Sequence, residues 1–402
     1  MARKREDLFG RTIIYTNAEE ITAENLIDVI RKAYNVHKKN ASDIQYLYNY
    51  YKGDQPVLER TKSVRDDILN KAVENRAKQI VDFKVGYLYG EPVQYIASDT
   101  SDDEDAPSKI AQLNSWMRSE EMDAKNEELG EWQAICGTAY KIALPRDLVL
   151  DGDAPFEIYV PDPQQSFVIY SSALSHKPMA GVYYVTNDEN DTIYTIYTDT
   201  EVYKLKNFEE IIERGTNGLG RIPLVEYPAN TARLGAFEPV ITLLDSLNEI
   251  DSDRVDGVEQ FIQSLVIALN CDFEEGQTFS DIIKAGIVSL RSTEGMQQDI
   301  KILTEQLNQT QTQTLKEDLL AAIIQICAMP NRNGGSSTSD TGVAVVYRDG
   351  WSAAESDAKK QEMPFKRSER QFLELVLDIC RNLGGLDLYQ KDIDIQDRKS
   401  VV

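Results

Sequence analysis

One long amphipathic segment, residues 237–269, most limits how this chain can fold. Its apolar residues recur at the spacing of one helix face: Leu243, Leu244, Leu247, Ile250, Val258, Phe261, Ile262 and Leu265. At 100° per residue, acidic residues occupy about a third of the circumference opposite them: Glu238, Asp245, Glu249, Asp253, Asp256 and Glu259. We expect a helix that packs along its apolar side. This side is longer than one compact subunit can bury, so part of its apolar surface should remain exposed in the single chain.

The charge of this segment is strongly one-sided. Residues 237–268 contain seven acidic residues and one basic residue, Arg254. The whole chain has 67 Asp and Glu against 43 Lys and Arg, a net charge of −24. Proteins that clamp nucleic acid need a surplus of basic residues, so this balance argues against that class. The acidic face has two interpretations: a solvated helix face, or a surface that repels another polyanion.

The rest of the chain predicts a mixture of helices and antiparallel strands. Helical spacing predicts helices over 22–37, 39–51, 66–87 and 106–136, and a period of two predicts β structure over 137–207. Short strands are expected at 91–97 and 221–227, and another begins at 392–395. Residues 305–329 contain an apolar helix, 330–342 form a Gly/Ser/Asn loop, and 343–384 are helical with a break at Gly350.

Motifs for catalysis or metal binding are absent from the sequence. It contains no GxxxxGK[ST] phosphate loop and no GxSxG elbow, and His37 and His176 are too few for a histidine zinc site. The four cysteines form no CxxC pair, which predicts free thiols: Cys136, Cys271, Cys327 and Cys380. No apolar run approaches the roughly 20 residues that span a bilayer. We therefore expect no catalytic residue, metal, cofactor, membrane partner or secretion.

Six short motifs occur in a collinear order. The first three are YNYYKGDQ at 48–55, NRAKQIVD at 75–82 and GYLYGEPV at 86–93. The others are IPLVEY at 222–227, EPVI at 238–241 and TGVA at 341–344, after the glycine-rich loop. In this order, over residues 40–395, the chain resembles siphophage portal proteins, the head–tail connectors of tailed phages. Each motif alone is weak, and the order carries the resemblance.

The resemblance implies an α+β portal fold with named regions. These would be a helical and antiparallel β wing (1–236), a descending stem helix (237–269), a small α/β clip (270–304), an ascending stem helix (305–329), a channel loop (330–342), a wing/crown helix (343–384) and a C-terminal tail (385–402). Portal proteins usually continue further than Val402, so we expect a short or missing crown.

The resemblance also implies a function and partners. The chain would form a ring, a dodecamer, at one capsid vertex, with a channel for packaging and ejecting double-stranded DNA without sequence specificity. It would dock the terminase large subunit and then the head–tail adaptor, and contact major capsid and scaffolding proteins. Assembly would take place in the bacterial host cytoplasm, and the ring would remain in the virion.

Two groups of residues would meet the DNA. The acidic face of 237–269, from Glu238 to Glu259, would line the channel and keep phosphates from sticking. The channel loop would present Asn331, Arg332, Asn333, Gly334, Gly335, Ser336 and Ser337, with Arg332 as its sole cation.

Two alternatives remain open on sequence. A neck adaptor without a DNA-translocating role would have a smaller mass in solution than a portal ring. A hydrolase would need two carboxyl groups about 5 to 10 Å apart in a cleft; with 67 acidic residues, no pair is singled out.

Overall fold

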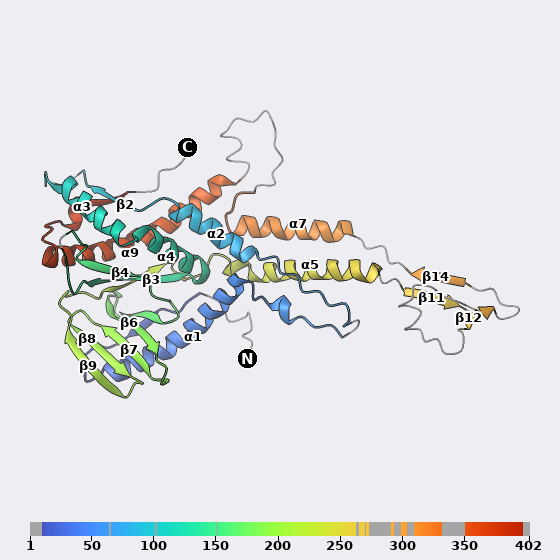
Figure 1. The fold of residues 1–402 in the computed structure, drawn as a ribbon, viewed down its shortest axis with the longest axis horizontal. Helices are drawn as coiled ribbons and strands as arrows, with labels where there is room; N and C mark the ends of the chain where they lie inside the picture. The colour runs from blue at the N-terminus through green and yellow to red at the C-terminus, as the bar shows by residue number, and fades with distance from the viewer. Residues whose placement is uncertain are drawn as a thin grey trace, which may run out of the picture. The chain divides into compact units, whose positions relative to one another are not determined.

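The structure is a computed structural model that describes residues 10–63, 66–99, 101, 103–150, 152–262, 265–269, 271–272, 291–292, 299–303, 309–331 and 350–396. The chain divides into two units (Figure 1). Unit 1 comprises Met1–Asp54, Asn75–Leu244 and Ala321–Val402, and unit 2 comprises Gln55–Glu74 and Asp245–Leu320. Helices and largely antiparallel sheets occur together, which confirms the α+β class.

A six-stranded sheet and one long helix form the first part of unit 1. The sheet has the order β1-β5-β6-β7-β8-β9, and only β1 runs parallel to its neighbour. Its strands are β1 (Ile14–Thr16), β5 (Ser166–Ser171), β6 (Pro178–Thr186), β7 (Thr192–Tyr197), β8 (Glu201–Lys206) and β9 (Glu210–Thr216). The predicted alternation is confirmed in β7 and β8, where every second side chain is buried against helix α1 (Leu26–Lys52).

Helix α1 is continuous, so the prediction of separate helices at 22–37 and 39–51 is wrong. Asn40, near the expected break, has helical backbone and is buried. Its side chain accepts a hydrogen bond from Thr12 N at 2.9 Å and donates to Thr12 O at 2.8 Å. A long-range partner thus satisfies the amide that would otherwise compete with the helix. The helix ends at Gly53, in the left-handed region with φ 101°.

Two other helix predictions also need correction. The expected helix 66–87 begins only at Arg76, as α2 (Arg76–Tyr89), with Asn75 capping it. The expected helix 106–136 is two helices, α3 (Ala106–Ser119) and α4 (Met122–Cys136). They separate at Glu120 and Glu121, where the Glu120 carboxylate accepts from the Arg146 side chain at 2.5 Å and from Ile158 N at 3.2 Å.

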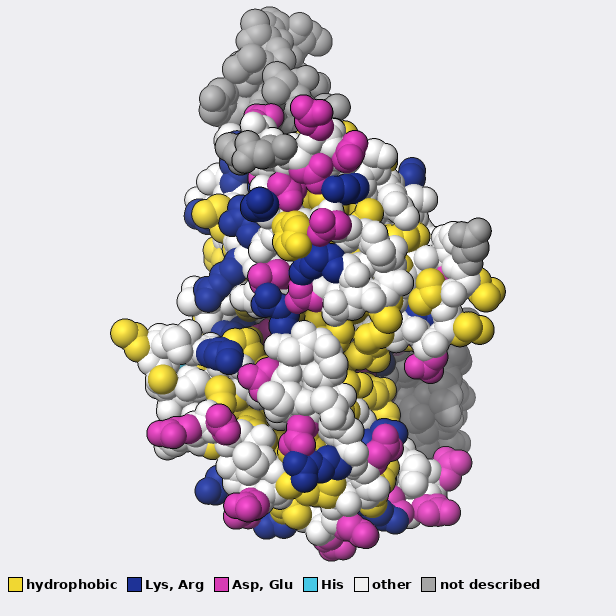
Figure 2. Space-filling view, turned by 90° about the vertical axis from the view of Figure 1, so that its left-hand side faces the viewer, with side chains coloured by type: hydrophobic (Ala, Val, Ile, Leu, Met, Phe, Trp, Pro, Cys, Tyr) yellow, Lys and Arg dark blue, Asp and Glu magenta, His cyan; other side chains and the backbone are white. Residues whose placement is uncertain are grey.

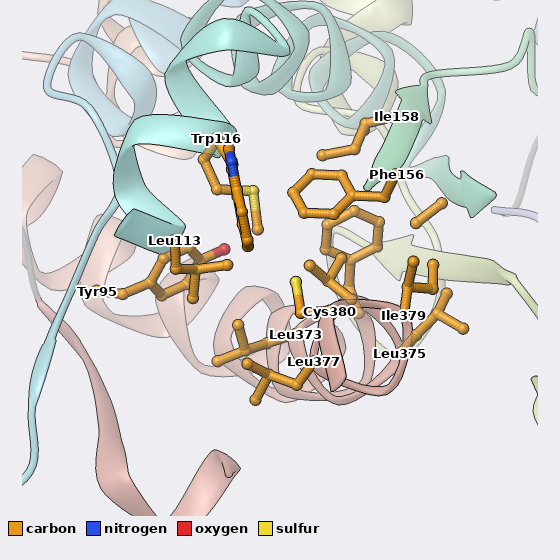
Figure 3. Packing of buried hydrophobic residues seen from close by; sticks show 14 of the residues in the cluster. Tyr95, Leu113, Trp116, Phe156, Ile158, Leu373, Leu375, Leu377, Ile379 and Cys380 are labelled. Atoms are coloured by element: carbon orange, nitrogen blue, oxygen red, sulfur yellow. The ribbon is translucent and has the colours of Figure 1, made fainter. Parts of the chain in front are cut away.

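The second part of unit 1 packs helices on two small sheets. One sheet has the order β10-β3-β4, and β15 pairs antiparallel with β2. These strands are β2 (Gln94–Ala97), β3 (Thr138–Pro145), β4 (Phe156–Tyr159), β10 (Leu224–Pro228) and β15 (Ile393–Gln396). Helix α9 (Trp351–Leu383) begins after Gly350 as expected. Figure 3 shows Trp116 of α3, Phe156 of β4 and Cys380 of α9 gathered in one buried cluster.

A fully buried ion pair lies beside this cluster. Lys141 Nζ of β3 is 3.1 Å from Glu369 Oε2 of α9, and neither side chain is exposed. The Glu369 carboxylate also accepts from the Tyr95 hydroxyl at 2.6 Å and from the Tyr227 hydroxyl at 2.7 Å. Lys141 donates to Asn126 Oδ1 at 2.8 Å. Burial lowers the pKa of Lys141, and Glu369 offsets part of this effect.

Unit 2 contains parts of two helices, together with two strand pairs and residues 55–74. Its elements, some shared with unit 1, are η2 (Pro56–Glu59), α5 (Ile241–Ile262), β11 (Leu265–Leu269), β12 (Cys271–Asp272), β13 (Arg291–Ser292), β14 (Asp299–Leu303) and α7 (Gln309–Ile326). Strand β11 pairs antiparallel with β14, and β12 with β13. The expected helix 237–269 is thus too long: a short 3-10 turn, η3 (Glu238–Val240), precedes α5, and 265–269, where Val266 and Ile267 favour a strand, pair with β14.

We predict that Lys141→Met destabilises the protein by about 3–5 kcal/mol, because Glu369 is left as a buried charge without its cation. Denaturant unfolding measures this change. The control is Lys204→Met, whose pair with Glu213 is exposed and contributes at most about 1 kcal/mol. Equal effects of the two substitutions would contradict the prediction.

Candidate functional site

Residues 55–74, which we call the strap, follow helix α5 within unit 2. The backbone N–H groups of Asn70, Ala72 and Glu74 donate to side-chain oxygens of α5: Asp256 at 2.7 Å, Ser252 at 3.0 Å and Asn248 at 2.9 Å. Two extended residues span about 6.6 Å and four helical residues about 6 Å, so every second strap residue meets every fourth α5 residue. Because these backbone N–H groups donate to α5, they cannot donate within a helix. This explains why residues 66–75 are not helical.

Asp256 is the central acceptor of this interaction. Its carboxylate receives the side chains of Lys62 and Arg60, the latter at 3.1 Å, together with the backbone and side-chain amides of Asn70. Its side chain is only 5% exposed. Burial raises the pKa of Asp256, but the hydrogen bonds from Lys62 and Asn70 outweigh burial and lower it. Asp256 is therefore a carboxylate neutralised within its own unit.

The expectation that the whole acidic face meets water is wrong. Glu238, Asp245 and Asp256 are buried. Glu238, in unit 1, lies 2.6 Å from Arg11 and accepts from Gly10 N and Gly235 N. Glu259 is half-buried and accepts from Asn70 Nδ2 at 2.8 Å.

Glu249 and Asp253 form the exposed edge of this face. Asp253 contacts Arg60 but keeps 65% of its side chain exposed. Glu249 is exposed, with no ion pair or hydrogen bond from its side chain to the described part of the chain. The basic residues Arg60 and Lys62 of the strap were the sequence signal for the neutralised part of the face.

Helix α7 meets another side of α5 within unit 2. Lys316 Nζ lies 2.7 Å from Asp251 and 3.0 Å from Glu74 of the strap. Burial lowers the pKa of Lys316, but its hydrogen bonds to these two carboxylates raise it overall. Burial and the neighbouring Glu74 raise the pKa of Asp251. This cation therefore joins the strap, α5 and α7.

Unit 2 also exposes apolar side chains. Val255 and Val258 of α5 are 47% and 46% exposed, and Leu315 of α7 is 51% exposed. Val258 was expected on the packed face of the helix, so within this chain that face is only partly covered. In the face of the molecule that Figure 2 shows, acidic and basic side chains are interspersed, so the net negative charge is not gathered into one patch there.

The start of the expected channel loop, 330–342, lies beside Gly350 in unit 1. A Cβ atom placed on Gly350 would lie 3.4 Å from Met329 O and 3.6 Å from Pro330 Cα. Asn331 is described, whereas Arg332, Asn333, Gly334, Gly335, Ser336 and Ser337 lie outside the described residues, as does the end of the loop.

His37 and Tyr50 have packing roles. His37 is buried, stacks on Phe167 and has Nε2 2.9 Å from Gln164 O; burial lowers its pKa to about 4. Tyr50 is buried and stacks on Phe237. Within the part of the chain that the structure describes, no cluster of three His, Cys, Asp or Glu residues could hold a metal ion, and no helix is long and apolar enough to cross a membrane.

Comparison with known proteins decides the family. The family model described as "Phage portal protein, SPP1 Gp6-like" matches residues 30–399. The chain belongs to this family of phage portal proteins. Portal proteins assemble into rings and bind capsid and tail components, and the family is a structural one.

One solved structure and one negative result complete the comparison. The portal chain is similar to a chain of "Neck of empty GTA particle computed with C6 symmetry", with 11% sequence identity, 81% of each chain covered and a TM-score of 0.44. No curated protein matches the sequence.

We predict that Asp256→Asn loosens the strap of this portal protein. Loss of the charge leaves Lys62 and Arg60 without their shared carboxylate, at a cost of about 1.5–3 kcal/mol. Trypsin cleavage after Arg60, Lys62 and Lys71 should then accelerate at least about tenfold, since each 1.4 kcal/mol is tenfold.

Asp253→Asn is the matched control, because an exposed pair contributes about 0–1 kcal/mol. Since the folded pKa of Asp256 is lowered, its contribution is complete above pH about 4 and is lost only as the pH falls through the lowered value. Equal cleavage of both variants and the unaltered chain would show that Asp256 does not hold the strap.

Proposed function

We propose that this chain forms a closed ring at one vertex of a phage capsid, through which double-stranded DNA is packaged and ejected. The observation that carries the proposal is the portal family match over residues 30–399. The ring acts as a conduit without catalysis of its own. It docks the terminase large subunit and later the head–tail adaptor through residues 270–304, and contacts major capsid and scaffolding proteins.

The exposed apolar side chains of unit 2 support ring formation. Val255 and Val258 on α5 and Leu315 on α7 are each about half exposed in the single chain. Because these side chains lie on different helices, the contact between copies joins two unlike surfaces, and a contact of this kind gives a ring when the rotation between copies closes.

The channel surface is smaller than the sequence suggests. Glu249 and Asp253 keep their carboxylates exposed and repel passing phosphates. The carboxylate of Asp256 is instead paired with cations of the strap. The loop 330–342 enters the channel, and Pro330, at its start, lies beside Gly350. Arg332 provides its brief contact with DNA.

We predict that the purified protein has the mass of a closed ring, and that Val255→Glu combined with Val258→Glu leaves it monomeric. Added carboxylates cannot be buried in an apolar contact without a large cost. Light scattering measures both masses. The control pair Val185→Glu and Ile212→Glu alters similarly exposed residues of the six-stranded sheet and should leave rings intact.

A monomeric unaltered protein would overturn the ring and favour the neck adaptor. Rings of normal mass from the Val255 and Val258 variant would instead show that the contact lies elsewhere.

We predict that Glu249→Lys combined with Asp253→Lys slows DNA translocation at least about tenfold while rings still form. Each lysine recurs in every copy and adds phosphate contacts around the channel. Asp256 is left unchanged because its reversal would release the strap. Packaging by purified motor and rings measures the rate, and Glu209→Lys with Glu210→Lys is the charge-matched control. A normal rate would remove Glu249 and Asp253 from the channel surface.

A further inference from the structure

One face of α9 carries basic side chains that the described residues do not pair with a carboxylate. Lys360, Arg367 and Arg370 are exposed, and their spacing places them within about a quarter of the helix circumference. Met363 lies between them on the same face and is 72% exposed. We call these four residues the basic row.

The acidic residues of α9 are largely committed elsewhere. Their partners are Tyr87 and Lys359 for Glu355, Lys84 for Asp357, Lys141 for Glu369, and Arg221 for Glu374 and Asp378. By contrast, no ion pair joins Lys360, Arg367 or Arg370 to a carboxylate of the described residues. Within a chain of net charge −24, the helix thus keeps an exposed positive face.

The row lies shortly after the proposed channel loop. Helix α9 starts after Gly350, which lies against Met329 and Pro330. Its first turns are attached to α2 by the Lys84–Asp357 pair at 2.6 Å and by the Tyr87 hydroxyl, which donates to Glu355 at 2.8 Å. At 1.5 Å per residue, the row begins about 15 Å along the helix from Gly350.

We propose that the basic row binds the phosphate backbone of double-stranded DNA inside the ring. Arginine forms paired hydrogen bonds to phosphate, and lysine adds charge without reading sequence. Repeated in every copy, the row retains DNA by many weak contacts, while Glu249 and Asp253 keep another part of the channel repulsive. This inference rests on the proposed function. An acidic surface of a neighbouring copy is the competing partner for the row.

The test compares assembled rings of the full chain. Lys360→Gln, Arg367→Gln and Arg370→Gln are combined, and the control combines Lys32→Gln, Lys38→Gln and Arg118→Gln, which remove the same charge at exposed positions away from α9. Anisotropy of a short fluorescent duplex gives its affinity for the rings over a salt series. The α9 variant should bind at least about tenfold more weakly at low salt, and its salt slope should fall by about 0.9 per lost contact.

Each outcome decides the inference. A second variant combines Lys360→Arg, Arg367→Lys and Arg370→Lys and so keeps the charge of the row. Binding equal to that of the unaltered rings would support a contact that needs charge alone. Unchanged binding by the glutamine variant, or no binding by unaltered rings, would overturn the basic row and leave the ring intact as a proposal. Loss of rings only in the α9 variant would overturn it by assigning the row to a contact between copies. An unaltered chain that forms no rings would overturn the proposed function itself.

Discussion

Unit 2 depends on the interaction between the Asp256 carboxylate and the strap. One carboxylate receives two cations and two amide groups, and it does so from a nearly buried position. A carboxylate in that position without these partners would be strongly unfavourable, and so would the strap cations without the carboxylate. The same interaction fixes the alignment of the strap, because Ser252 and Asn248 accept the next two alternate backbone N–H groups.

This alignment divides the acidic residues of α5 into two classes. The buried Asp256 binds the strap and contributes to the folded subunit, whereas Glu249 and the largely exposed Asp253, which contacts Arg60 of the strap, remain available to act on a passing polyanion. An acidic helix therefore does not translate directly into an acidic channel surface. The opposite holds for α9, whose acidic residues are taken up by other helices and strands, so that a helix of mixed sequence presents a positive face.

Local patterns predicted a large part of this fold. The period of two over 137–207 corresponds to strands β3 to β8, the predicted helix end at residue 51 lies one residue from the end of α1, and the strand at 392–395 corresponds to β15. Family membership was likewise accessible from the order of short motifs. These features depend on residues close in sequence, whose periodicity and turn chemistry are visible without a structure.

The errors concern contacts between distant residues. The helical period continues through 66–75, but Asn70, Ala72 and Glu74 donate to side chains more than 170 positions away. Asn40 likewise remains helical because of its bonds to Thr12. Helix α5 was expected to continue through 265–269, yet those residues find a partner strand. The acidic face was misread for the same reason, since its partners are distant in sequence: Arg11 for Glu238, and Arg60 and Lys62 of the strap for Asp256.

Electron cryo-microscopy of the assembled protein tests the central claim most directly, by locating α5 and the strap relative to the ring axis. The account predicts a closed ring in which Glu249 and Asp253 face the axis, with the strap beside them on the neighbouring side of α5. A ring with Glu249 and Asp253 on its outer surface, or with the strap covering them, would contradict the account.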